Sequence, residues 1–159
     1  MLRLLPWLII AHAAKDCAER RGGAFITLQV GDGQHISQWL EDDAFIDTAI
    51  MHATRNLRGR PARSIPVFNR IMNGTDCDRR YSWHVDPHDV GGWEEVATEV
   101  CDASPAYIEK NGAEWMRSPG KWCPWTVSVL NVEDRRGPRS EFIGKEPVLN
   151  KEAELAFKP

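Results

Sequence analysis

Residues 81–125 read YSWHVDPHDVGGWEEVATEVCDASPAYIEKNGAEWMRSPGKWCPW, and most of what can be predicted about the fold comes from this stretch. Ser104-Pro105 is a typical helix start, because serine caps a helix and proline is tolerated in its first turn. Cys101 precedes this helix and Cys123 follows it. The pattern predicts a frame closed by a disulfide, with the polar pair His84 and Asp86 mounted close by.

The cysteine count points to an oxidising compartment. The chain has four cysteines and no C-x-x-C pair, which argues against a zinc ribbon or a thioredoxin-type site. Four cysteines allow three pairings, and spacing alone does not choose among them. We favour Cys101 with Cys123, which leaves Cys17 with Cys77; a loop of this kind stabilises a fold by about 3 kcal/mol. The alternative is four buried thiols in a reducing cytosol.

Composition places the chain among ordinary globular proteins. Its 159 residues fit one domain, and 42% hydrophobic and 27% charged residues are typical of such a domain. The net charge of −3 gives no basic face for nucleic acid, so no nucleic-acid partner is expected. Seven tryptophans exceed what the size requires, and a cluster of them either fills a core or forms a recognition surface.

The N-terminal residues 1–14 have the character of a signal segment. Arg3 precedes an apolar run from Leu4 to Ile10, and Ala11-His12-Ala13 has a small-x-small pattern. The run is shorter than the roughly 20 residues needed to span a bilayer. We therefore expect a secreted or periplasmic protein with no transmembrane segment. The alternative is an amphipathic N-terminal helix that packs on the body.

Periodicity predicts the first half of the fold. Residues 24–30 alternate between apolar and polar, residues 31–33 form a turn, and residues 34–40 resume the alternation, which together indicate a hairpin. A helix capped by Asp42 or Asp43 follows and ends before Gly59. Its apolar positions are Ile46, Ala49, Ile50, Ala53 and Leu57. Residues 65–72 read as one strand, and Pro66 indicates an edge strand or the start of a strand.

The second half is predicted less evenly. Residues 81–85 and 125–130 read as strands, whereas residues 93–101 fit either period and favour a strand. The helix after Ser104 has an apolar face and ends at residues 118–120; that face comprises Tyr107, Ile108, Trp115 and Met116. The prediction is an α+β fold with one mostly antiparallel sheet and two helices packed on it. The domain spans residues 24–133, and residues 134–159 form a loosely attached tail.

Three motifs carry a resemblance to a known family. They are Trp83-His84-Val85-Asp86-Pro87, Glu99-Val100-Cys101-Asp102 and Trp122-Cys123-Pro124-Trp125. In this order they resemble the BP-seventy-four N-terminal domain-like family, from about Phe25 to Val132. The resemblance implies a compact, mostly secreted domain without an established catalytic activity. The chain departs from the family pattern at Gly91-Gly92, where bulkier residues are usual.

The candidate site is the pair His84 and Asp86. Positions i and i+2 of a strand share a face, so both side chains point the same way. With His88 they form a possible ligand set for zinc or another divalent ion, and Asp86 orienting His84 is a possible catalytic pair. The structural alternative is that a hydrogen bond fixes His84 while Asp86 caps the turn at Pro87.

Two function classes follow from these residues. The first is a small exported, non-catalytic recognition domain without a cofactor, which binds a protein or a glycan. Its expected binding residues are Trp83, His84, Asp86, Trp122 and Trp125, since aromatic side chains dominate such contacts. The second is a metal-assisted hydrolase or lyase centred on His84 and Asp86. Neither a Gly-x-Ser-x-Gly elbow nor a phosphate-binding glycine loop occurs in the sequence.

Overall fold

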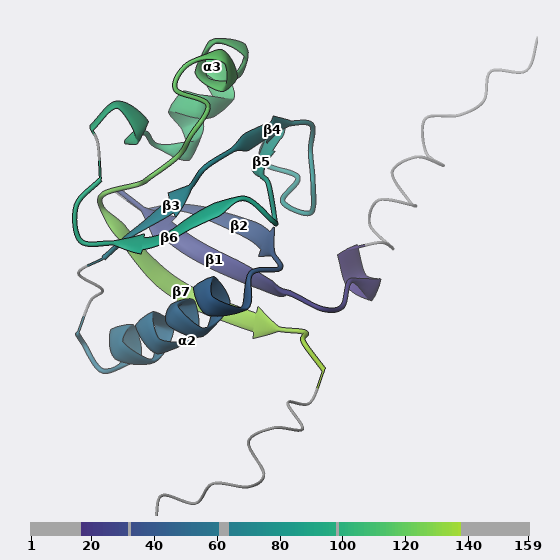
Figure 1. Cartoon of the computed structure of the whole chain (residues 1–159), viewed down its shortest axis with the longest axis vertical. Coiled ribbons are helices and arrows are strands. Elements are labelled where there is room, and N and C mark those ends of the chain that lie inside the picture. The colour runs from purple at the N-terminus through teal and green to yellow at the C-terminus, as the bar shows by residue number, and fades with distance from the viewer. Residues whose placement is uncertain (1–16, 32, 61–63, 98, 138–159) are drawn as a thin grey trace, which may run out of the picture.

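A three-stranded antiparallel sheet lies at the centre of the fold (Figure 1). The computed structural model describes residues 17–31, 33–60, 64–97 and 99–137. The predicted hairpin is confirmed as β1 (Ala24–Val30) and β2 (Gln34–Leu40), paired from Ala24 with Leu40 to Val30 with Gln34. β7 (Val127–Asp134) pairs with the other edge of β1. The expected N-terminal apolar segment, residues 1–14, lies outside the described residues.

The first long helix, α2 (Asp43–Leu57), begins and ends as predicted. The Asp42 side chain accepts the Phe45 N–H at 2.7 Å, which satisfies one of the free donors of the first turn. The predicted buried stripe was only partly right, because Ile50 and Leu57 are exposed. The buried face instead comprises Phe45, Ile46, Ala49 and His52. This face packs against β7, β1 and β6.

The predicted strand over residues 65–72 is interrupted at Asn69 and Arg70. Its first part, β3 (Ile65–Phe68), pairs with β6 (Val90–Glu94), and its second part, β4 (Ile71–Asn73), pairs with β5 (Trp83–Val85). The described strands therefore form three antiparallel sheets, instead of the single sheet that was expected. The α+β class, with antiparallel pairing and helices packed on strands, holds.

The predicted strand over residues 93–101 is right only for Trp93 and Glu94. β6 ends at Glu94, and a short 3-10 helix, η1 (Glu99–Cys101), follows. The strand begins at Val90, earlier than expected, and includes Gly91-Gly92. Gly92 has φ +92°, and a Cβ at Gly91 would lie 2.8 Å from Val67 Cγ1, so both positions suit only glycine.

The second long helix, α3 (Pro105–Arg117), starts as predicted. Ser104 is its N-cap, and the serine side chain accepts the Tyr107 N–H. Ile108 is buried as expected, whereas Tyr107 is exposed and packs edge-on against Trp115. The inward face of α3 is thus narrower than the sequence suggested.

Aromatic side chains link the two smaller sheets, β3–β6 and β4–β5, to α2. Trp83 meets Trp122 edge-on, Trp122 stacks on Phe68, and Phe68 contacts Phe45, with ring centroids 5.1–5.4 Å apart. Trp93 continues this series from Phe45. The surplus of tryptophan thus largely fills the core, where such rings bury much apolar area.

Both expected disulfides are present. Cys101 is bonded to Cys123, with Cα atoms 5.2 Å apart, and Cys17 to Cys77, with Cα atoms 5.7 Å apart. The first joins η1 to the segment before β7, and the second fastens the chain before β1 to the loop before β5. Two disulfides are consistent with an oxidising compartment. None of the helices in the described ranges is long and apolar enough to cross a membrane.

Candidate functional site

A groove of about 870 Å³ lies between α2 and β6. Its lining mixes charged, hydroxyl, aromatic and main-chain groups, which come from residues 42, 44, 45, 48, 51, 52 and 55 on or beside α2, from Ser64, and from residues 90–93 and 95. No site was predicted here from the sequence. A hollow of this size and mixed polarity is suited to binding a ligand.

Two sets of contacts hold the strand along the helix. The Glu41 N–H donates to the Pro87 carbonyl at 3.0 Å, so the start of α2 lies beside the chain that enters β6. At the far end, Glu94 of β6 pairs with Ile65. The residue before Ile65, Ser64, is hydrogen-bonded to His52 of α2. β6 therefore runs in the same direction as α2, with Asp42 near one end of the groove and Glu95 near the other.

His52 is the buried polar residue of the groove. It is 3% exposed, and its Nε2 lies 2.7 Å from Ser64 Oγ. Burial, helped by the positive charge of Arg55, lowers the pKa of His52 below its ordinary value of 6.5. The imidazole is therefore neutral at pH 7.

The other ring nitrogen of His52 determines what the pair can do. Nδ1 is buried and has no hydrogen-bond partner among the described residues. A buried N–H without an acceptor is rarer than an unused lone pair, so we assign the proton to Nε2, which donates it to Ser64 Oγ. A general base would have to accept the serine proton at Nε2. The pair therefore positions Ser64 without activating it as a nucleophile.

Trp93 lines the groove, and its ring is held against α2. Its ring contacts Phe45 and His52, with centroids 5.1 and 4.5 Å away, and its Nε1 donates to the Phe45 carbonyl at 3.3 Å. These contacts hold the indole against α2, and Trp93 as a whole residue is half-buried. The site thus has one fixed aromatic surface.

The predicted residue His84 lies elsewhere, on β5. Its Nδ1 is 2.8 Å from the Gly74 carbonyl, a hydrogen bond that fixes the ring, as the structural alternative supposed. His84 lines a smaller hollow of about 270 Å³ together with residues 20, 21, 39, 41, 76 and 87. Asp86 is not part of that lining.

Asp86 and His88 form the turn after β5. Asp86 Oδ1 accepts the His88 main-chain N–H at 3.0 Å, and Arg70 lies 3.9 Å from its other oxygen. His88 Nδ1 lies 3.6 Å from a carboxylate oxygen of Glu41. Asp86 thus caps its turn, and the three predicted ligands His84, Asp86 and His88 are not gathered as a metal-binding group in the described structure.

The predicted aromatic binding residues separate into two environments. Trp83 is 2% exposed and Trp122 is fully buried, so neither is available at the surface, and this part of the binding prediction was wrong. Both serve the core because they join the sheets. Trp125 is 38% exposed, beside the Cys101–Cys123 disulfide, and its N–H donates to Asp102.

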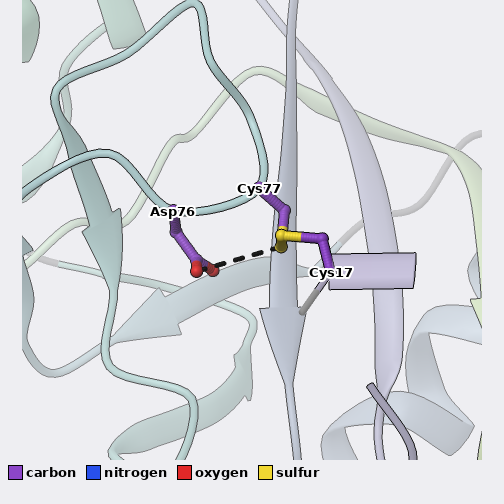
Figure 2. Close-up of side chains that lie close together, drawn as sticks. All are labelled: Cys17, Asp76 and Cys77. Atoms are coloured by element: carbon purple, nitrogen blue, oxygen red, sulfur yellow. Dashed lines mark hydrogen bonds between the residues drawn. A yellow bond between two sulfur atoms is a disulfide. The ribbon is translucent and has the colours of Figure 1, made fainter. Parts of the chain in front are cut away.

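One close group of potential metal ligands was found in the described ranges, and it surrounds a disulfide. Figure 2 shows Asp76 beside Cys17 and Cys77. Asp76 Oδ1 lies 3.9 Å from Cys77 Sγ. Both sulfurs are used in the disulfide, so they are not thiolate ligands. Arg20 binds the Asp76 carboxylate through two hydrogen bonds of 2.6 and 2.8 Å. The group therefore fastens the N-terminal segment to the fold.

Comparison with known proteins places this fold in a family. The family model for the BP-seventy-four N-terminal domain matches residues 24–136. The chain belongs to this family. No curated protein and no solved structure matches the chain. The match confirms the resemblance seen in the sequence motifs.

The matched part of the BP-seventy-four N-terminal domain contains the described lining of the groove. Every described residue of that lining lies between positions 42 and 95. Two signals in the sequence pointed to it without being recognised. The first is the helical spacing of His52 from the buried residues Phe45 and Ala49. The second is the pair Gly91-Gly92, which lies inside a strand that approaches Val67 closely.

Proposed function

We propose that this domain is a non-catalytic recognition module, secreted or periplasmic, which binds a protein or glycan partner without a cofactor. The observation that carries the proposal is the groove between α2 and β6. It combines the indole of Trp93, which is fixed against α2, with hydrogen-bond donors and acceptors along its lining. Such a mixture suits recognition by shape and hydrogen bonding.

The chemistry of the groove supports binding over catalysis. His52 is neutral and, in the tautomer assigned above, donates to Ser64. The alternative hydrolase or lyase would use His84 and Asp86, whose contacts fix a ring and cap a turn. Export is supported by the two disulfides and by the small-x-small pattern at residues 11–13.

The test compares two substitutions on the same helix. Met51 lines the groove and is 47% exposed, whereas Leu57 is 84% exposed and lies outside the lining. Ligands are selected from a glycan array and a linear-peptide display library with the purified domain. We expect Met51→Arg to weaken a selected ligand by about tenfold or more, because a long charged side chain obstructs the groove, whereas Leu57→Arg leaves affinity unchanged.

Trp125→Ala supplies the contrast with the other exposed aromatic surface. A ligand that loses affinity with Trp125→Ala and is indifferent to Met51→Arg would move the recognition surface to the Cys101–Cys123 disulfide. Ligands indifferent to both variants would refute the groove as the binding site. Equal melting temperatures of the three variants and the parent chain establish that folding is preserved.

A further inference from the structure

Resting on the proposed function, we infer that the groove takes an extended peptide, which adds as a strand to the free edge of β6. The partner is then a protein segment with a basic side chain, and the main chain of Trp93 is its anchor. The inference depends on which way the main-chain groups of β6 point, on where the groove lies and on the charges along it.

The hydrogen bonds of β3 give the direction of the β6 main chain. Phe68 N–H donates to the Trp122 carbonyl at 2.8 Å and Phe68 C=O accepts the Trp122 N–H at 2.9 Å, so both Phe68 groups point away from β6. Main-chain groups alternate along a strand, so those of Val67 and Ile65 point toward β6. Their partners there are Gly92 and Glu94.

It follows that Trp93 presents its main chain on the other side of β6. Its opposite residue in the register is Pro66, which has no N–H to donate. Among the described residues no strand pairs with this second edge, because the sheet consists of β3 and β6 alone. The N–H and C=O of Trp93 are therefore placed as a donor and an acceptor for an incoming strand.

The groove lies at this same edge. Its lining includes residues 90–93 of β6 and much of α2, but no residue of β3. A hollow over the face of the sheet would be lined by both strands.

A peptide satisfies this edge better than a sugar does. One peptide residue opposite Trp93 accepts its N–H and donates to its C=O, and the residues on either side direct their main-chain groups away. Alternate side chains of the peptide then face α2, where Met51 and Thr48 line the groove. Sugars offer hydroxyl groups without this repeating pair of donor and acceptor.

The charges of the lining indicate the kind of peptide. Asp42 and Glu95 lie toward opposite ends, and Arg55 is the lone cationic side chain in the described lining. His52 adds no charge at pH 7, because its pKa is lowered. Two carboxylates against one guanidinium favour a peptide with a lysine or arginine, whose charge complements this excess.

The test uses linear peptides selected from a display library with the whole chain, resynthesised with one N-methyl group at each position in turn. We expect N-methylation of a single residue to weaken binding by about tenfold or more, because it removes the N–H donated to Trp93, while methylation of its two neighbours has little effect. We also expect the selected peptides to be enriched in lysine and arginine, and Glu95→Gln to weaken them.

The outcomes separate this inference from the proposed function. Peptides that lose affinity with Met51→Arg but tolerate N-methylation everywhere would overturn strand addition and leave groove recognition standing. A glycan that requires the groove, with no peptide selected, would do the same. If no ligand of either kind is sensitive to Met51→Arg, the proposed function and the inference fall together.

Discussion

The residue that most distinguishes this domain is His52, a buried imidazole between Ser64 and Trp93. Its neutral form is favoured in the folded state, because burial and Arg55 lower its pKa. The unfolded chain takes up a proton at the ordinary pKa of 6.5, at a pH where folded His52 is still neutral. Stability attributable to this residue is therefore full above pH 6.5 and falls as the pH drops below it.

The lowered pKa of His52 makes the stability of the domain depend on pH. Lowering the pH from 7.5 to 5 should reduce the free energy of unfolding, with a slope of at most about 1.4 kcal/mol per pH unit from this group. His52→Gln cannot titrate, so its stability should vary less over the same range. Urea denaturation at several pH values measures both. A slope that is the same in both proteins would contradict a lowered pKa.

Two buried indoles make a matched pair at the same scale. Trp122 Nε1 donates to the Ala103 carbonyl at 2.9 Å, whereas buried Trp83 Nε1 has no acceptor among the described residues. Replacement by phenylalanine removes a similar volume from each site. Trp122→Phe also leaves the Ala103 carbonyl without its donor, so we expect it to be the more destabilising by about 1–2 kcal/mol. Urea denaturation of both variants measures the difference, and equal losses would refute it.

Among the elements, η1 depends most on a covalent link. It has one turn, and Cys101 joins it to Cys123 just before β7, where the Cys123 N–H also donates to the Cys101 carbonyl at 2.8 Å. Opening this link frees a long loop in the unfolded chain, which raises its entropy. The disulfide thus stabilises a segment with little regular hydrogen bonding of its own.

Removing the link should cost about 3 kcal/mol of stability. The variant for this measurement is the double substitution Cys101→Ala with Cys123→Ala, which leaves no free thiol at the site. Its midpoint in urea should lie below that of the parent chain under oxidising conditions. If the parent chain unfolds at the same urea concentration with and without reductant, the disulfide does not stabilise the fold.

For the molecule as a whole, the arginines after β7 close the fold. Arg136 binds Asp43, Asp47 and Asp134 at 2.7–3.0 Å, so the end of the last strand is tied to the first turns of α2. Hydrogen bonds to Asp134 and then to the two helix carboxylates raise the pKa of Arg136. The preceding residue, Arg135, donates a hydrogen bond to the Cys17 carbonyl at 2.6 Å. Arg135 and Arg136, which the sequence assigned to the tail, thus contact the segment before β1 and the start of α2.

Arg136→Ala should therefore destabilise the whole domain. The side chain is nearly buried and its charge is paired, so we expect a loss of about 1–3 kcal/mol. Arg58→Ala, at an exposed position after α2, is the matched control and should change stability by less than about 0.5 kcal/mol. Thermal unfolding of the two variants makes the comparison, and equal melting temperatures would show that the Arg136 contacts are too weak to matter.

Local patterns were sufficient for the two long helices and the first hairpin. Asp42 and Ser104 cap the helices because a short polar side chain satisfies free N–H groups wherever it precedes a helix. The sequence over residues 24–30 alternates between apolar and polar because one face of this strand is buried and the other is not. These features depend on neighbours within a few residues, so the sequence was enough to place them.

The candidate site was beyond such patterns, because its parts are distant in sequence. Ser64 and His52 meet through the return of the chain after α2, and Trp93 meets them only through the pairing of β6 with β3. Trp83 and Trp122 looked like surface aromatics for the same reason. Nothing near them in sequence shows that they pack on each other across two sheets.

By itself the sequence determined the class of the fold, the helix ends, the central hairpin and the family, since each rests on short-range hydrogen bonding or on contiguous motifs. Tertiary structure alone decided that the described strands divide into three sheets and that, among them, β6 keeps one edge unpaired beside α2. The reason is physical. Strand pairing and burial depend on contacts between residues far apart in the chain, and competition among those contacts is settled only when the whole core packs.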